Sequence, residues 1–250
     1  MHRVRFGPPV IAAAIGALAA AALGPGLAGA ASAAPHRAPR PGAWTQVTAA
    51  GMLDFADIGL ARGTDGVLHV VWTTGSTGKF AIMDTPIAAD GAVGHPVTVG
   101  AHEYQATFPD ATATPTRIYA FWNIISNSTP QAIVGLAKAS RPAGGGPWNA
   151  LIPVAKDLNL VWSFSVSAAT GSDGKPWVVF GIPGGFELLH FGNAERTIGI
   201  KGCCVYNPGI GTSTVWKSYV SAQSGRLDIV ALLTVRGKTA WWATQVLPPK

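Results

Sequence analysis

Two aspartates hold matching places in an internal repeat, and their carboxyl groups are the best candidates for acid–base chemistry in this chain. The tripeptide Phe-Ala-Asp ending at Asp57 recurs as Phe-Pro-Asp ending at Asp110, each time at the start of a predicted strand. If these strands surround one channel, the two carboxyl groups lie at its mouth, and a separation of about 5–9.5 Å would suit glycosidic hydrolysis. Ser167 and Ser221 take the corresponding places in later units. Because these later units have serine in place of aspartate, the sequence favours the alternative that each aspartate caps backbone N–H groups.

The adjacent pair Cys203 and Cys204 contains the only cysteines. In an exported protein they are expected to be oxidised, and a vicinal disulfide, two intermolecular bonds and two free thiols are the possible states. Successive Cα atoms lie about 3.8 Å apart, below the usual disulfide range of about 4.4–6.8 Å, so a vicinal bond needs a distorted or cis peptide. We expect this bond, as a structural staple or as a rigid turn facing a ligand. The spacing predicts no metal site, no redox motif and no cofactor.

Aromatic residues form a third group of candidates. Three of the nine tryptophans lie on repeated strands and are expected in the core: Trp72, Trp122 and Trp177. Trp162, Tyr206 and Trp216 fall in or near predicted loops. Flat rings exposed there could stack on the apolar faces of sugars, and packing in the core is the alternative.

The elements that would position these residues come from a repeat of about 50 residues. The strand His-Val-Val-Trp ending at Trp72 recurs in similar form ending at Trp122, Phe180 and Leu232. The turn before it carries glycine or proline each time, as in Gly-Thr-Asp-Gly at 63–66, where Asp-Gly between two apolar runs predicts a hairpin. About four strands a unit is typical of a β-propeller blade, and a β-sandwich is the alternative.

We predict an all-β propeller of about four blades, the last with three strands. The strands are expected at 56–61, 67–73, 79–85 and 96–99; at 107–113, 117–124, 131–139 and 148–154; at 163–169, 176–181, 186–191 and 196–200; and at 218–223, 227–234 and 239–246. The β-prone run Trp44–Thr48 is a candidate to pair with 241–246 and close the ring. The alternative is a fragment of a larger propeller that exposes a blade edge.

The first 34 residues have the pattern of a secretory signal. Arg3 and Arg5 precede an apolar run, and Ala-Ser-Ala at 31–33 is a cleavage site, so we expect export with cleavage near Ala33. A retained anchor is the alternative, but the run is shorter than the roughly 20 residues that a membrane span needs. A Pro- and Arg-rich leader is expected at 35–42 and the propeller domain at 43–250, with no membrane span after cleavage.

The net charge of +6 does not describe the predicted domain, because four of the 18 basic residues precede residue 43. The domain keeps 14 basic and 12 acidic residues, which are scattered along the chain. This pattern argues against nucleic acid as a partner.

Four motifs carry a resemblance to a known family. They are the segment 63–72, Phe-Pro-Asp-Ala-Thr-Ala-Thr-Pro at 108–115, Gly-Ser-Asp-Gly-Lys-Pro-Trp-Val-Val-Phe at 171–180 and Cys-Cys-Val-Tyr-Asn-Pro-Gly at 203–209. The chain resembles exported actinobacterial proteins of the sialidase-like (BNR or Asp-box-related) propeller superfamily, over most of residues 50 to 245. The resemblance implies a propeller with a site at the mouth of its central channel, and in some members sugar hydrolysis.

The leading hypothesis is a secreted, non-catalytic propeller that binds a glycan or another cell-surface polymer at the channel mouth. One alternative is a sialidase-like glycoside hydrolase that uses Asp57 and Asp110. The other is a truncated propeller that assembles through its open edge. The sequence leaves the oligomeric state undetermined.

Overall fold

A computed structural model gives the structure of residues 46–48, 57–76, 79–102, 105–125, 133–149, 152–160, 166–182, 185–190, 194–199, 215–223, 226–236 and 238–246. All of them belong to one compact unit, His36–Lys250. Every named element in these ranges is a β-strand, which confirms the all-β prediction. Within the same ranges no helix has the length and hydropathy needed to cross a membrane. The predicted signal and leader lie outside them.

The strands form four antiparallel sheets, each built from consecutive segments of the chain. The first sheet contains β1 (Gly59–Arg62), β2 (Leu68–Ser76), β3 (Lys79–Ile87) and β4 (Val97–His102). The second contains β5 (Gln105–Ala113), β6 (Arg117–Ile125), β7 (Ile133–Pro142) and β8 (Ile152–Leu160). The third contains β9 (Val166–Thr170), β10 (Pro176–Ile182), β11 (Gly185–His190) and β12 (Ala194–Gly199). The fourth contains β13 (Val215–Gln223), β14 (Arg226–Val235) and β15 (Lys238–Val246).

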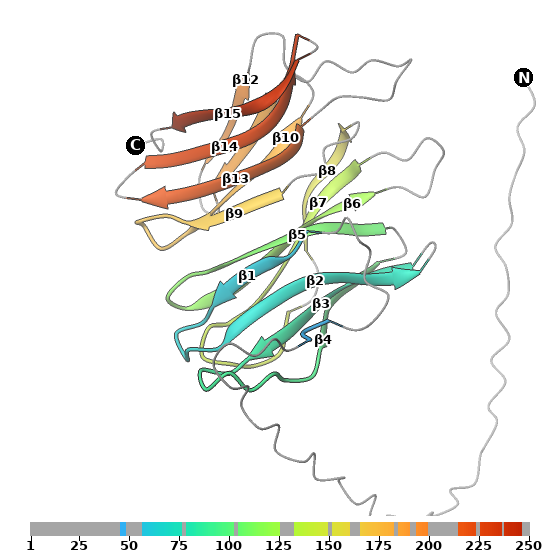
Figure 1. Cartoon of the computed structure of the whole chain (residues 1–250), viewed down its shortest axis with the longest axis vertical. Helices are drawn as coiled ribbons and strands as arrows, with labels where there is room; N and C mark the ends of the chain where they lie inside the picture. The colour runs from blue at the N-terminus through green and yellow to red at the C-terminus, as the bar shows by residue number, and fades with distance from the viewer. Residues whose placement is uncertain are drawn as a thin grey trace, which may run out of the picture. The chain divides into compact units, whose positions relative to one another are not determined.

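The four sheets are successive blades of a β-propeller, as the repeat predicted. Their first strands lie next to one another in chain order, since β1 contacts β5, β5 contacts β9 and β9 contacts β13 (Figure 1). Buried apolar clusters fill the spaces between neighbouring sheets. Trp122 belongs to the cluster between the first and second sheets, and Trp177 to that between the third and fourth. Each sheet therefore buries a face that it could not bury alone.

The Gly-x-Asp-Gly segments form the same tight turn in two blades. Between β1 and β2, the N–H of Gly66 donates to the carbonyl of Gly63 at 3.0 Å, and Gly66 has a φ of 81°. Between β9 and β10, Gly174 donates to Gly171 at 3.0 Å with a φ of 73°. The positive φ requires glycine, because a side chain is strained there. These turns set the spacing of the strands that the sequence predicted.

The first two blades approach each other closely at Gly59 in β1. A Cβ atom at this position would lie 2.5 Å from the backbone nitrogen of Ala111 and 2.7 Å from the Cα of Asp110. Any side chain there would push the first blade away from the second. The glycine thus lets β1 lie directly against the part of β5 that holds Asp110.

Two sequence predictions differ from the structure. The strand expected at 148–154 is β8 at Ile152–Leu160, because Trp148 instead turns inward to a buried polar group. The strand expected at Trp44–Thr48 does not pair with β15 in its described part. Residues 46–48 form no strand, and the carbonyl of Val47 accepts a 2.7 Å hydrogen bond from Thr85 of β3. The β-propensity of this segment indicated that it can adopt an extended conformation. It could not indicate which strand the segment would contact.

Candidate functional site

A distorted stretch of β5 presents Asp110. The register between β5 and β6 shifts between Thr107 and Asp110, and the buried Phe108 has a φ of 53°. A bulky residue rarely adopts this left-handed conformation. Such irregularities re-aim the side chains that follow them. The bulge therefore turns the Asp110 carboxyl group toward the neighbouring blade.

Both carboxyl oxygens of Asp110 accept backbone hydrogen bonds. Oδ1 accepts from the N–H of Ala111 at 2.7 Å, and Oδ2 accepts from the N–H of Ala168 in β9 at 2.7 Å. The second bond joins the second blade to the third. The capping role that the sequence favoured for this aspartate is therefore confirmed.

The electrostatic setting of Asp110 is unusual for a carboxyl group. Burial raises its pKa from 3.8 to about 6, against the lowering effect of the hydrogen bonds from Ala168, Ala111 and Ser167. The nearby charge of Asp57 adds to the rise. The two aspartates that the repeat singled out are thus close enough for the charge of Asp57 to affect the partly buried Asp110.

The same type of link recurs between the next two blades. The buried Ser167 accepts a hydrogen bond at its Oγ from the N–H of Val220 in β13, at 3.0 Å. Ala168 and Val220 therefore hold equivalent places, which aligns Tyr219 with Ser167 and Asp110. The sequence alignment had placed Ser221 there.

Asp57 joins the first blade to the last. It lies two residues before the start of β1, and its Oδ1 lies 2.7 Å from the Nζ of Lys217 in β13. The hydrogen bond to Asp57 raises the pKa of Lys217. Both side chains keep about a third of their surface exposed, at 37% for Lys217 and 30% for Asp57. The pair is therefore open to a ligand.

An aromatic surface continues from this ion pair across the fourth sheet. The Lys217 ammonium lies 5.4 Å from the ring centroid of Tyr219, and that ring stacks on Trp241 of β15 with centroids 6.1 Å apart. Tyr219 is 51% exposed and Trp241 is 55% exposed. We call Asp57, Lys217, Tyr219 and Trp241 the junction cluster.

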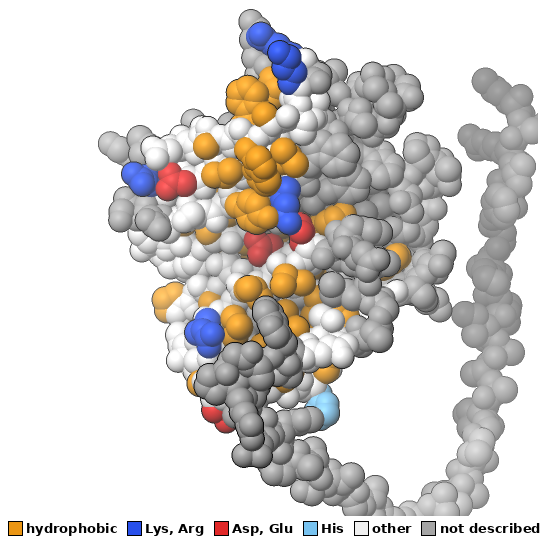
Figure 2. Space-filling view, in the orientation of Figure 1, with side chains coloured by type: hydrophobic (Ala, Val, Ile, Leu, Met, Phe, Trp, Pro, Cys, Tyr) orange, Lys and Arg blue, Asp and Glu red, His pale blue; other side chains and the backbone are white. Residues whose placement is uncertain are grey.

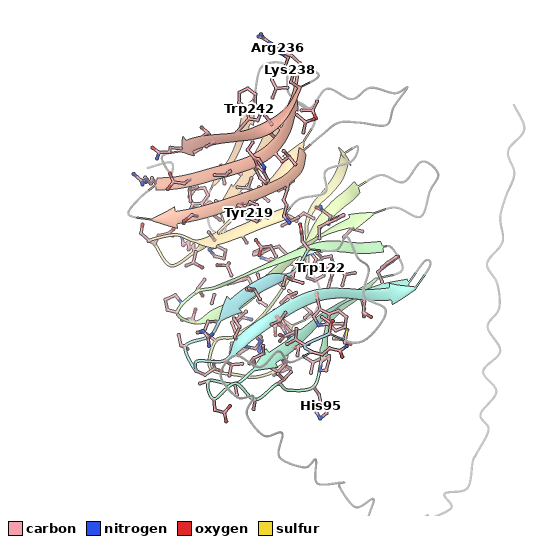
Figure 3. The ribbon with its side chains drawn as sticks, in the orientation of Figure 1. His95, Trp122, Tyr219, Arg236, Lys238 and Trp242 are labelled. Carbon is pink, nitrogen blue, oxygen red and sulfur yellow. The ribbon has the colours of Figure 1, made fainter. Side chains whose placement is uncertain are left out.

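Figure 2 shows hydrophobic side chains gathered over the fourth sheet, with basic and acidic side chains beside them. Val230 and Leu232 of β14 share the face of the junction cluster, since Tyr219 pairs with Val230 and Trp241 with Leu232. Trp242 points to the opposite face, because neighbouring strand residues alternate. Figure 3 labels Tyr219 on β13 and Trp242 on β15. Trp241 and Trp242 therefore lie on opposite faces of the fourth sheet.

The other predicted site residues are not brought into this cluster by the described structure. Trp162, Tyr206, Cys203 and Cys204 lie outside the described residues, so the vicinal disulfide stays a prediction. Trp216 lies in β13, but the described side chains of that strand begin at Lys217.

Sequence reasoning missed Lys217, Tyr219 and Trp241. One signal was available: adjacent tryptophans in one strand must point to opposite faces, so the pair at 241 and 242 could not enter a single core.

The described residues contain no group of three or more His, Cys, Asp or Glu side chains that could hold a metal ion. The junction cluster has one carboxylate and one ammonium, which neutralise each other. Its chemistry is that of aromatic stacking with hydrogen bonding at one border.

No protein-family model matches the chain, and no curated protein matches it. Solved structures that resemble it include a GH43_1 enzyme from Xanthomonas citri, with 12% identity, a TM-score of 0.45 and coverage of 75% of this chain and 73% of that one. A xylan β-1,4-xylosidase from Bacillus halodurans C-125 has 11% identity, a TM-score of 0.48 and coverage of 80% and 41%. An exo-β-1,3-galactanase from Phanerochaete chrysosporium has 10% identity, a TM-score of 0.49 and coverage of 74% and 46%.

These similar structures are named as a GH43_1 enzyme, a xylosidase and a galactanase, and none of the three is named as a sialidase. The structure has the propeller fold that the sialidase-like resemblance implies, while no family model or curated protein shows that superfamily. The chain spans less than half the length of the xylosidase and of the galactanase. Likeness of this extent carries no argument about the site.

Proposed function

We propose that this protein binds a neutral glycan on the junction cluster. The observation that carries the proposal is the exposed, stacked pair Tyr219 and Trp241 beside the ion pair of Asp57 and Lys217. Flat aromatic rings pack against the apolar faces of sugars, and charged groups at their border can bond to hydroxyl groups. The export expected from the first 34 residues directs the proposal to extracellular glycans.

The charges of the cluster support a neutral ligand. Lys217 and Asp57 are paired at 2.7 Å, and the carboxyl group of Asp110 lies close enough to couple with Asp57. The only cation of the cluster is thus already engaged. An acidic sugar would meet uncompensated negative charge, whereas a neutral sugar would not.

Replacing Trp241 with alanine is expected to weaken glycan binding by at least about tenfold, the equivalent of roughly 1.4 kcal/mol. Titration calorimetry with xylo-oligosaccharides, β-1,3-galacto-oligosaccharides, cello-oligosaccharides and sialyllactose would measure this affinity. Trp242→Ala is the matched control, since it removes the same side chain from the same strand on the opposite face. Absence of saturable binding across the panel, or equal losses in both variants, would contradict the proposal.

A second candidate function is glycoside hydrolysis with Asp57 and Asp110. The observation that favours it is the coupled pair itself, because two carboxyl groups in different environments are the usual basis for acid and base roles. Since both oxygens of Asp110 already accept backbone N–H groups, Asp57 is the one of the two whose exposed side chain can face a substrate.

Under this second candidate, Asp57→Asn is expected to lower the turnover of xylan or an aryl β-xyloside by at least about a hundredfold. Asp228→Asn is the control, since Asp228 is a partly exposed carboxylate of β14 that pairs with Arg226 instead. Release of reducing sugar from each substrate is the measurement. Unchanged turnover in Asp57→Asn would remove the hydrolase candidate and leave the binding proposal in place.

A further inference from the structure

In the described part of the chain, the fourth sheet ends at β15, at the position where the other sheets carry a further strand. The first three sheets each have four strands, whereas the fourth has three in the described part of the chain, and β15 lies at its border. Every residue from Lys238 to Gln245 is exposed. A strand of nine residues with an exposed edge is a template for pairing with another strand.

The composition of β15 favours such pairing. Its sequence, Lys-Thr-Ala-Trp-Trp-Ala-Thr-Gln-Val, contains no proline and a single charge, at its first residue. The border strands of two other sheets carry features that discourage pairing. Pro153, Lys156 and Asp157 lie in β8, and Glu195 and Arg196 lie in β12. The edge of β15 therefore lacks the protection that charges and proline give elsewhere.

The segment expected to cover this edge lies elsewhere in its described part. Residues 46–48 are the last three of the run predicted to pair with β15. Instead, the carbonyl of Val47 accepts its hydrogen bond from Thr85 in the first sheet. The described chain thus offers no strand to β15 beyond β14.

β15 is complementary to a second copy of itself. In an antiparallel pair with a two-fold axis perpendicular to the sheet, residues of equal parity face each other. An axis through Trp242, the middle of the nine residues Lys238–Val246, lets the whole strand pair. Trp242 then meets Trp242 of the second copy, and Lys238 meets Val246. No like charges face each other, and the central contact is an aromatic cross-strand pair, which is stabilising.

From this edge we propose that the protein forms a two-fold dimer in which the β15 strands of two copies pair antiparallel about Trp242. The two three-stranded sheets become one continuous six-stranded sheet. A two-fold axis perpendicular to this sheet keeps the two junction clusters on the same side. Under the proposed function, a glycan chain long enough to reach both clusters is held by two sites and gains avidity.

Sedimentation of the purified protein over a range of concentrations tests the dimer. Trp242→Lys places two ammonium groups against each other at the axis, and we expect its dimer dissociation constant to rise at least about tenfold. Val230→Lys is the control, since this exposed residue lies on β14, away from the edge, and its dimer should persist.

Paired substitutions test the register. Thr239 faces Gln245 of the second copy, so Thr239→Glu with Gln245→Lys should keep the dimer, and Thr239→Glu with Gln245→Glu should weaken it at least about tenfold. A monomer at every concentration would overturn the proposal, as would a dimer equally stable in both paired variants. A monomer that dimerises only after removal of residues 35–45 would also overturn it, by assigning the edge to the chain's own N-terminal segment.

Discussion

Replacing Asp84 with asparagine is expected to lower the free energy of unfolding by about 3–5 kcal/mol, because it breaks a buried charge network. Asp84 of β3 is fully buried, and its Oδ2 lies 2.8 Å from Nδ1 of His69 and 3.3 Å from Nη1 of Arg141. The indole N–H of Trp148 donates to the same oxygen at 3.0 Å. Without the carboxylate, the Arg141 guanidinium stays largely buried and loses its counter-charge. The contacts with Arg141 and Trp148 also join the first blade to the second.

Urea unfolding followed by tryptophan fluorescence would measure the loss. Asp90→Asn is the matched control, because this exposed aspartate only accepts a hydrogen bond from the N–H of Ala92 in a turn. We expect the control to change stability by less than about 0.5 kcal/mol. A double-mutant cycle with Arg141→Met would report the coupling between the two charges. A loss below about 1 kcal/mol in Asp84→Asn would show that this network contributes little to stability.

Sequence reasoning predicted the blades because their signals are local. The turn that ends at Gly66 depends on Asp65 and two glycines within four residues, and the same set builds the turn that ends at Gly174. Alternating apolar residues between such turns then give strands of known direction. These local features can be recognised in the sequence without knowing how the blades pack against one another.

The network and the junction cluster were not predictable from sequence, because their members are far apart along the chain. Asp84 and Trp148 are 64 residues apart, and Asp57 and Lys217 are 160 apart. Only blade packing brings them together. The repeat did identify Asp57 and Asp110 as equivalent, but it could not show that one would pair with a lysine and the other with backbone N–H groups. Those partners depend on the bulge at Phe108 and on the last blade's position.

Asp110 is expected to make the protein less stable as the pH rises from about 4 to about 6. Its pKa in the folded protein is about 6, against an ordinary value of 3.8, so the folded state binds the proton more tightly than the unfolded state. The free energy of unfolding therefore falls across this window and levels off above it, by up to about 3 kcal/mol. Burial of the carboxyl group causes this cost, and the bonds from Ala168 and Ala111 reduce it.

Comparison of the unmodified protein with Asp110→Asn at each pH isolates this contribution, since asparagine does not titrate. Between pH 4 and pH 7, the free energy of unfolding of the unmodified protein should fall by up to about 3 kcal/mol relative to that of Asp110→Asn. Asp173→Asn is the control of opposite sign. Although burial raises the pKa of Asp173, its hydrogen bonds from Lys175 and His190 lower it overall, so its contribution is lost as the pH falls below about 4. A pH-independent difference for Asp110→Asn would mean that the hydrogen bonds from the two backbone N–H groups fully offset the effect of burial on the pKa of Asp110.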